Sequence, residues 1–297
     1  MTQDEIARHL SLSRASVARM LDRARKSGIV TIGINAESLT SMELSSTLRS
    51  TFGLSEALVI PTPPNPSGST RSLNARIGLG GAQLLTSYLA KGTTLGVGFG
   101  ETVSEVIRGT SFPPLGQVEL VTLTGGVDGY LRPFMSSNPD PTRASPTTAS
   151  VMPSPIVASS AELAQSLKQE PTIKAVLEKA RAVDVAVVGI GTPTSSAVIV
   201  EMGLLDSDGV DILLRNHVVG DILGQFFDSE GRLVDLHINR MRIGIELDEL
   251  KRIPRVIGVA GGIHKVDAIL AAVKGSHLDV LVTDEAVARE LLRRYPQ

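Results

Sequence analysis

Hydrophobic side chains in the first 30 residues recur at helical spacing in two short runs, separated by Ser11-Leu12-Ser13. The first run is predicted to form a helix whose opening turn is capped by Thr2 and Glu5. The second is predicted to form a helix capped by Ser13. The residues expected at the buried positions of the two helices are Ile6, Ala7 and Leu10, and Val17, Leu21 and Ala24. This pattern predicts a helix pair that packs through its apolar faces, as in a helix-turn-helix.

An alternating stretch and a third amphipathic run follow the helix pair. Residues 30–35 alternate between apolar and polar and predict a short strand or wing. Residues 37–52 carry Leu39, Leu44 and Leu48 at helix-compatible spacing, which predicts a linker helix. We therefore expect a helix-turn-helix domain over residues 1–35 and a linker over residues 36–53.

From Leu54 onward, apolar runs that end in glycine alternate with helical patterns. This alternation predicts an α/β domain over residues 54–297, with a Rossmann-like, mostly parallel sheet covered by helices on both faces. The predicted strands are 94–99, 118–124, 184–190, 255–259 and 278–282. The predicted helices are 71–91, 173–182, 266–273 and 285–292. Residues 61–68 form a predicted loop, and residues 129–155, rich in Pro, Ser, Thr and Asn, are expected to form a long surface loop near the site.

The length of the chain predicts about two domains, and the amino terminus and the lengths of the apolar runs predict a cytoplasmic protein. Its 297 residues include no cysteine, so disulfides play no part, and we expect neither a metal nor a cofactor. The amino terminus is charged within five residues, and no apolar run approaches the roughly 20 residues of a membrane span. We therefore expect no signal peptide and no contact with a membrane.

The amino-terminal end is more basic than the rest of the chain. Residues 1–35 hold six Lys or Arg against three Asp or Glu, while the whole chain has a net charge of −2. A basic head on an acidic body fits operator DNA as a partner, but an ordinary amphipathic helix pair with solvated arginines explains the same pattern. The residues expected to contact bases or phosphates are Ser13, Arg14, Ala15, Ser16, Arg19 and Arg23.

Glycine-rich turns follow four of the predicted strands. The turn containing Gly98 and Gly100 leads into a helix start, where backbone amides favour an anionic group such as phosphate. It does not fit the dinucleotide-binding fingerprint, because Glu101 stands where a third glycine is required. The other turns are residues 124–126, 189–192 and 260–262. A parallel sheet brings such strand ends to one edge, which predicts a pocket lined by amides.

Three charged side chains are the nearest candidates for side-chain chemistry in such a pocket. Asp221, Lys265 and Asp284 are candidates for chemistry in the pocket, and each has a structural alternative. Asp221 fits a turn cap, Lys265 a solvated lysine in a first helical turn, and Asp284 the cap of the last helix. The sequence pattern alone leaves these alternatives open.

Four blocks of the chain resemble the SorC-type (DeoR/SorC) bacterial transcriptional regulators. The blocks cover residues 2–21, 96–103, 220–235 and 256–292. The resemblance implies an amino-terminal DNA-binding domain and a sugar-phosphate-sensing domain related in fold to phosphosugar isomerases. It also implies a homo-oligomer, a dimer or tetramer, that regulates a carbohydrate operon and changes its DNA affinity when a phosphorylated sugar binds.

The resemblance further suggests which residues contact the effector. Asp221 resembles the acceptor of ligand hydroxyls and Lys265 the cationic contact. With the glycine-rich turns, the expected effector-binding residues are Gly98, Gly100, Glu101, Thr102, Thr124, Gly125, Gly126, Gly191, Asp221 and Lys265. The chain departs from the family pattern at Glu101, where members often carry a basic or neutral residue, and at Phe99, where they often carry Trp.

Three functions remain open at this point. The leading hypothesis is a ligand-responsive regulator without catalytic residues. A phosphosugar isomerase would use Asp221, Asp284 and Lys265 as acid-base groups. A sugar-binding module with an incomplete DNA-binding domain follows from the further helix that family members usually carry before residue 2.

Overall fold

The computed structural model describes residues 7, 12–26, 36–61, 70–113, 118–126, 148–194, 200, 205 and 207–295. The chain divides into two units, residues 1–40 and residues 41–297. Apart from Ala7 the predicted first helix lies outside the described residues, as do the predicted wing, all but Pro61 of the 61–68 loop, and residues 129–147 of the long loop. None of the helices in the described ranges is long and apolar enough to cross a membrane.

In the first unit, the predicted second helix is present as α2 (Arg14–Lys26). Ser13 caps it as expected, because its Oγ accepts a hydrogen bond from the Ser16 amide at 3.1 Å. Ala7 and Val17 are buried, as the apolar pattern predicts. The side chains of Leu21, Arg23 and Ala24 lie outside the described residues.

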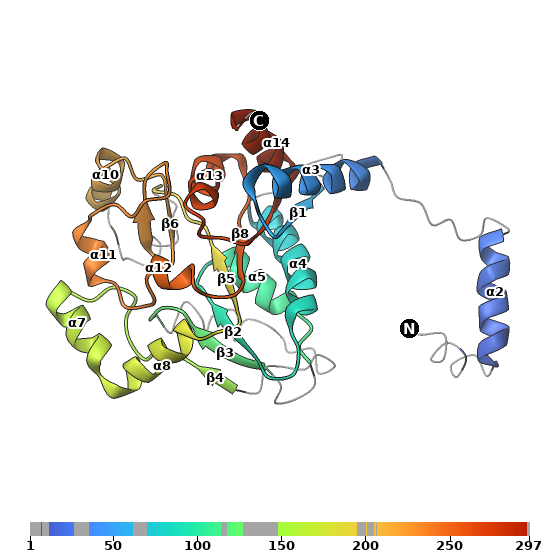
Figure 1. Ribbon diagram of the computed structural model, residues 1–297, viewed down its shortest axis with the longest axis horizontal. Helices are drawn as coiled ribbons and strands as arrows, with labels where there is room; N and C mark the ends of the chain where they lie inside the picture. The colour runs from blue at the N-terminus through green and yellow to red at the C-terminus, as the bar shows by residue number, and fades with distance from the viewer. Residues whose placement is uncertain are drawn as a thin grey trace. The chain divides into compact units, whose positions relative to one another are not determined.

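The second unit is built on a sheet of seven parallel strands, in the order β1-β9-β8-β5-β2-β3-β4 (Figure 1). The strands are β1 (Glu56–Ile60), β2 (Thr93–Val97), β3 (Val118–Thr122), β4 (Thr148–Ser150), β5 (Val185–Gly189), β8 (Val256–Val259) and β9 (Val280–Asp284). All five predicted strands are confirmed to within two residues at either end, and the parallel α/β fold with them. The sheet gains an edge strand on each side, β1 and β4, which the pattern did not delimit.

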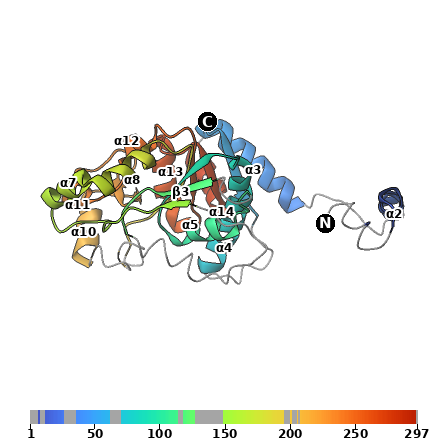
Figure 2. The ribbon, with the colours of Figure 1, turned by 90° about the horizontal axis from the view of Figure 1, so that it is seen from below.

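Helices cover both faces of this sheet and form two apolar cores (Figure 2). In β5, Val185 and Val187 pack with one core, whereas Ala186 and Val188 pack with the other, as the alternation of side chains in a strand requires. The first core is covered by α4 (Thr70–Tyr88) and α5 (Glu101–Gly109). The second is covered by α3 (Ala36–Phe52), α8 (Pro171–Arg181), α13 (Val266–Lys274) and α14 (Glu285–Arg294).

Smaller elements extend the unit beyond the sheet. The antiparallel hairpin of β6 (Gly220–Ile222) and β7 (Gln225–Phe227) packs against α13. The remaining elements are α7 (Ala161–Gln169), α10 (Ser207–Arg215), α11 (His237–Met241), α12 (Leu247–Leu250) and the 3-10 turn η1 (Ile263–Lys265).

The predicted linker helix exists, but only part of it fits a linker. Leu48 is fully buried in the core of the second unit, and Leu44 packs against that core. The Ser45 Oγ accepts a hydrogen bond from the Val59 amide of β1 at 3.0 Å. Leu39 remains 48% exposed. The second half of α3 is therefore an integral part of the α/β unit rather than a spacer.

The end of the predicted surface loop is also different from expectation. Residues 148–150 form β4 at the edge of the sheet, paired with β3. Met152 is completely buried, and its amide donates to the Thr122 Oγ1 at 2.9 Å. The prediction of a surface loop is therefore wrong for residues 148–150, which complete an edge of the sheet, and for Met152, whose side chain belongs to the core.

Glycines within α4 have a packing function. A Cβ on Gly78 would overlap the Glu105 Cβ of α5, and one on Gly81 would lie 2.9 Å from Val106 Cγ2. A Cβ on Gly80 would instead overlap the end of the Ile60 side chain of β1. The helix tolerates these glycines because they permit close contact with α5 and with the sheet.

Candidate functional site

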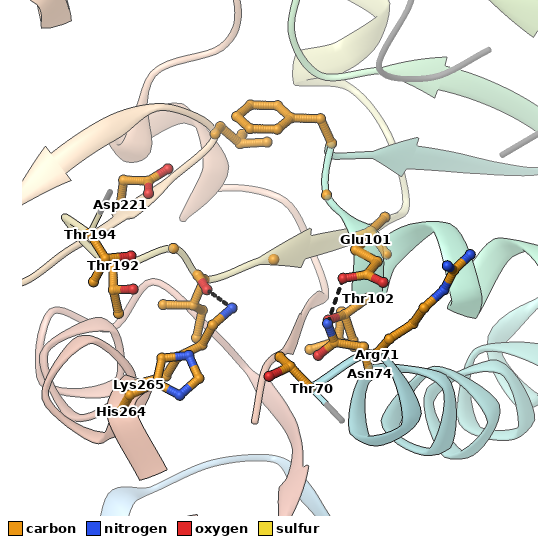
Figure 3. Close-up of a pocket in the computed structure, with 18 residues that line it drawn as sticks. Thr70, Arg71, Asn74, Glu101, Thr102, Thr192, Thr194, Asp221, His264 and Lys265 are labelled. Atoms are coloured by element: carbon orange, nitrogen blue, oxygen red, sulfur yellow. Dashed lines mark hydrogen bonds between the residues drawn. The ribbon is translucent and has the colours of Figure 1, made fainter. Parts of the chain in front are cut away.

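The sheet topology creates a cavity between β2 and β5. These two strands are neighbours, but the chain continues from β2 to β3 on one side and from β5 to β8 on the other. Ligands of open α/β sheets bind at such a reversal, beyond the carboxyl ends of the strands. A cavity of about 580 Å³ lies there (Figure 3). Its lining is Thr70, Arg71, Asn74, Phe99, Gly100, Glu101, Thr102, Val103, Gly189, Ile190, Gly191, Thr192, Thr194, Asp221, Leu223, Val259, His264 and Lys265.

The turn after β2 delivers the start of α5 to this cavity. Gly98 continues the strand, and its amide donates to the Val187 carbonyl at 2.8 Å. Gly100 has φ 131°, a conformation that favours glycine, and it precedes α5 without a capping side chain. The first amides of α5 therefore open toward the cavity with the positive end of the helix dipole.

A carboxylate nevertheless occupies this helix start. Glu101 is exposed and lines the cavity, and its Oε2 accepts a hydrogen bond from the Asn74 Nδ2 of α4 at 2.8 Å. Figure 3 shows this pair on the opposite side of the cavity from Asp221 and Lys265. The guanidinium of Arg71 extends past Glu101, away from Lys265.

Asp221 reaches the cavity from the β6–β7 hairpin. A tight turn at Leu223 and Gly224, with φ of 56° and 74°, folds the hairpin back so that the Gly224 amide donates to the Asp221 Oδ2 at 3.1 Å. The Asp221 backbone pairs with Gly191 in both directions, at 2.9 and 3.2 Å. Burial raises the pKa of Asp221 to about 6, although the Gly224 hydrogen bond and the charge of Lys265 lower it.

Lys265 projects into the same cavity from η1. Its Nζ donates to the Ile190 carbonyl at 3.0 Å. Burial lowers the pKa of Lys265, while the carboxylates of Asp221 and Glu101 oppose this effect. The pKa of the neighbouring His264 is also lowered, first by burial and then by the charge of Lys265. The cavity thus presents one lysine that is attracted by carboxylates on two sides, a setting suited to a ligand with both hydroxyl and anionic groups.

Asp284 performs the structural task that the sequence left open. Its Oδ1 accepts from the Val287 amide at 3.1 Å and so caps α14, while its Oδ2 accepts from the Gly262 amide at 2.7 Å. Asp284 is buried and does not line the cavity. The interpretation of Asp284 as a helix cap is therefore confirmed.

The turn after β3 also lies elsewhere. Thr124 pairs with Gly244, the Gly125 amide donates to the Ile243 carbonyl at 3.0 Å, and the Gly126 amide donates to the Ser154 carbonyl at 2.7 Å. None of these three predicted effector contacts lines the cavity. Gly98, a fourth predicted contact, is also absent from the lining, because it continues strand β2. Of the four turns expected to converge, two supply lining residues, those after β2 and β5, which flank the reversal point; residues 124–126 and 260–262 lie outside the lining.

Six of the ten predicted effector-binding residues line the cavity together: Gly100, Glu101, Thr102, Gly191, Asp221 and Lys265. Sequence reasoning missed the contribution of α4, which supplies Thr70, Arg71 and Asn74. These residues belong to α4, which follows β1 after a loop rich in helix-breaking residues. A helix that starts after the carboxyl end of a strand was therefore the sequence signal that could have identified them. Sequence reasoning also missed Thr194, Leu223 and His264, which lie close in the chain to predicted residues.

The residues predicted to contact DNA lie at the start of α2. Ser13, Arg14, Ala15 and Arg19 are exposed, and Ser16 is half-buried. The Oγ atoms of Ser13 and Ser16 lie 2.9 Å apart, so these hydroxyls also serve the cap. Across the described ranges, no group of three or more His, Asp or Glu side chains is arranged to hold a metal ion.

Comparisons with known proteins agree on one family. Residues 36–293 match a sequence family described as "Putative sugar-binding domain". The transcriptional regulator LsrR of Enterobacter sp. (strain 638) is 38% identical over 296 residues, covering 98% of this chain and 88% of that protein. The full-length sorbitol operon regulator SorC from Klebsiella pneumoniae has a similar structure, with a TM-score of 0.74, 29% identity, and coverage of 98% of this chain and 94% of that one. A DeoR family transcriptional regulator from Listeria monocytogenes gives a TM-score of 0.76 and 28% identity, covering 85% of this chain and 99% of that one.

Proposed function

The chain belongs to the SorC-type family of sugar-binding transcriptional regulators, and from this premise we propose that it controls a carbohydrate operon in response to a phosphorylated sugar. The cavity between β2 and β5 would hold the sugar, and α2 would contact operator DNA. Binding of the sugar would change the affinity for DNA.

The observation that carries this proposal is the charged lining of the cavity. Asp221 is buried and Lys265 half-buried at its edge, where a carboxylate accepts from sugar hydroxyls and an ammonium attracts a phosphate. Withdrawing these two charges from water costs stability, so their position at an open cavity favours a role in ligand binding.

The DNA side of the proposal is supported by α2. Arg14 and Arg19 are exposed on a helix that Ser13 caps, and residues near the amino end of such a helix read base edges in the major groove. The relatives named above are transcriptional regulators by name. We therefore assign α2 as the recognition helix.

Coupling between the two sites requires two states of the protein that bind the sugar with different affinity. We propose that these states are two arrangements of a homo-oligomer, since a symmetric dimer would place two recognition helices on two half-sites of an operator. The same sugar would then favour one arrangement and alter DNA affinity.

An isomerase is the weaker alternative. Asp284, one of its three acid-base candidates, is engaged in capping α14 and lies outside the cavity lining. The relatives carry names of regulators rather than enzymes.

A thermal-shift screen against phosphorylated sugars tests the ligand side. A sugar that binds only the folded protein raises the apparent stability by about 3 kcal/mol at a concentration 100 times its dissociation constant. We expect at least one phosphorylated sugar to raise the melting temperature, without being turned over. A panel that produces no shift, or a sugar that is isomerised, would count against the proposal.

A further inference from the structure

Helices α4 and α5 run side by side in matched register along the wall of the cavity. Gly78 faces Glu105 and Ala82 lies 2.9 Å from the position of a Cβ on Gly109, so each contact is repeated one helical turn along. One turn in the other direction, Asn74 meets Glu101 at the cavity. The small residues of this stripe therefore determine how closely Asn74 and Glu101 approach.

Asn74 has one hydrogen-bonding atom satisfied and one not. The residue is only 6% exposed, and its Nδ2 donates to the Glu101 carboxylate. Because a carboxylate only accepts, the amide must present its NH₂ group there and keep the Oδ1 for another donor. Within the described part of the chain, that Oδ1 is buried and has no hydrogen-bond partner.

A buried acceptor without a donor costs free energy, so it favours a ligand that supplies one. Asn74 lines the cavity, and Figure 3 shows its side chain turned toward the space between Thr70 and Glu101. The Asn74 Oδ1 and the carboxylate of Glu101 together form a surface of acceptors. Neither atom has a proton to offer to a phosphate.

The charge of Glu101 also affects the position that a phosphate can take in the cavity. The open amides at the start of α5 would attract a phosphate, but the Glu101 carboxylate beside them repels it. On the opposite side of the cavity, Lys265 offers a cation to a phosphate, and its charge is opposed by the carboxylate of Asp221 beside it. The side formed by Asn74 and Glu101 therefore presents acceptors, whereas the side formed by η1 and the β6–β7 hairpin pairs a cation with the carboxylate of Asp221.

We propose that Asn74 and Glu101 form a hydroxyl-recognition subsite that fixes the orientation of the effector. Sugar hydroxyls donate to the Asn74 Oδ1 and to the Glu101 carboxylate, and the phosphate lies nearer Lys265 than the first turn of α5. This inference rests on the proposed function and adds to it that the effector is a polyhydroxylated sugar whose hydroxyl end faces α4 and α5.

The rival orientation places the phosphate at the start of α5, with Arg71 as its cation. The two orientations predict opposite effects of Glu101→Gln. If hydroxyls donate to Glu101, removing its charge weakens the sugar phosphate, because hydrogen bonds to an ionised acceptor are stronger. If the phosphate lies there, removing the charge relieves repulsion and tightens binding.

The test is isothermal titration of the full chain with ribose 5-phosphate, fructose 6-phosphate, glucose 6-phosphate and inorganic phosphate. For the sugar phosphate that binds most tightly, we expect Glu101→Gln to raise the dissociation constant about fivefold and Asn74→Leu about tenfold. Inorganic phosphate should bind Glu101→Gln at least as tightly as it binds the original chain.

Glu105→Gln is the matched control, since it removes a carboxylate one turn along α5 that does not line the cavity. We expect it to leave both affinities unchanged. Tighter or unchanged binding of the sugar phosphate to Glu101→Gln would overturn the subsite while leaving the proposed function intact. Absence of binding by every sugar phosphate to the original chain would overturn both. Glu101 is exposed, so its variant tests the idea even if Asn74→Leu fails to fold.

Discussion

Asp221 is a carboxylate that the fold buries at the edge of the cavity, and burial raises its pKa from 3.8 to about 6. The folded protein consequently holds this proton more tightly than the unfolded chain does. The stability associated with the protonated carboxyl is therefore fully present below about pH 4 and is lost as the pH rises through about 6. At neutral pH the protein retains a charged group that its own packing disfavours, which is expected when the group serves a ligand.

Asp221→Asn should remove this penalty. We expect the unfolding free energy of the variant, relative to the original protein, to rise between pH 4 and pH 7 by on the order of 3 kcal/mol, because the shift is about two pKa units. Urea denaturation at several pH values measures the difference.

Glu119→Gln serves as a control, because we expect its effect on stability to depend on pH in the opposite direction. Hydrogen bonds from Lys179 and Ser150 lower the pKa of Glu119, so its contribution is present at neutral pH and lost as the pH falls. A stability difference between Asp221→Asn and the original protein that does not change with pH would contradict the burial of a titrating carboxylate at this position.

Single residues also mark where sequence reasoning reached its limit. Asp221 and Lys265 were identifiable, because they stand in long blocks that resemble a known family. Asn74 was not, since a lone asparagine in a helix carries no local signal and acquires its partner only when α5 packs against α4. Asp284 was ambiguous for the same reason, and only its contacts with Val287 and Gly262 identify it as a cap.

At the scale of elements, the contact between α4 and α5 depends on small residues. Gly78→Ala adds a methyl group that overlaps the Glu105 Cβ and lies 3.0 Å from the Glu105 backbone carbon, so α5 must move. We expect this variant to lose about 1 to 2 kcal/mol of stability, since overpacking exceeds the gain in helix propensity. Urea denaturation at constant pH measures the loss.

Gly80→Ala is the matched comparison within the same helix. Its methyl group would meet the end of the Ile60 side chain, which can rotate away, and alanine favours the helix. We therefore expect a smaller loss or a slight gain of stability. Equal destabilisation by both variants would show that Gly78 has no special function in positioning α5. Gly78→Ala should also weaken sugar binding, because it separates Asn74 from Glu101.

Elements with strong apolar patterns were predictable, and those without them were not. The five central strands were expected because each contains several apolar residues close together, as buried parallel strands do. The edge strand β4 contains Thr148, Ala149 and Ser150 and lies in a segment rich in loop-forming residues, so nothing in its composition distinguished it. The turn at residues 124–126 resembled the others in sequence, but its place in the sheet order is a property of topology.

At the scale of the whole molecule, the proposed regulation couples a cavity in the second unit to a helix in the first. The fold class and the family follow from the sequence, whereas the cavity requires the strand order and the packing of α4 that only the structure provides. The central claim is that occupation of this cavity alters the affinity of the protein for DNA.

Fluorescence anisotropy with DNA from upstream of the gene, measured with and without the sugar phosphate that stabilises the protein, tests this claim most directly. Arg14→Ala controls the DNA side and should weaken DNA binding while leaving sugar binding intact, since Arg14 is an exposed residue of α2. Asp221→Asn controls the ligand side and should bind DNA without responding to the sugar.

We predict salt-sensitive DNA binding whose dissociation constant changes by about tenfold when the sugar is added, a coupling of the size usual for allosteric proteins. A sugar phosphate that binds the cavity and leaves the DNA affinity unchanged would contradict the account.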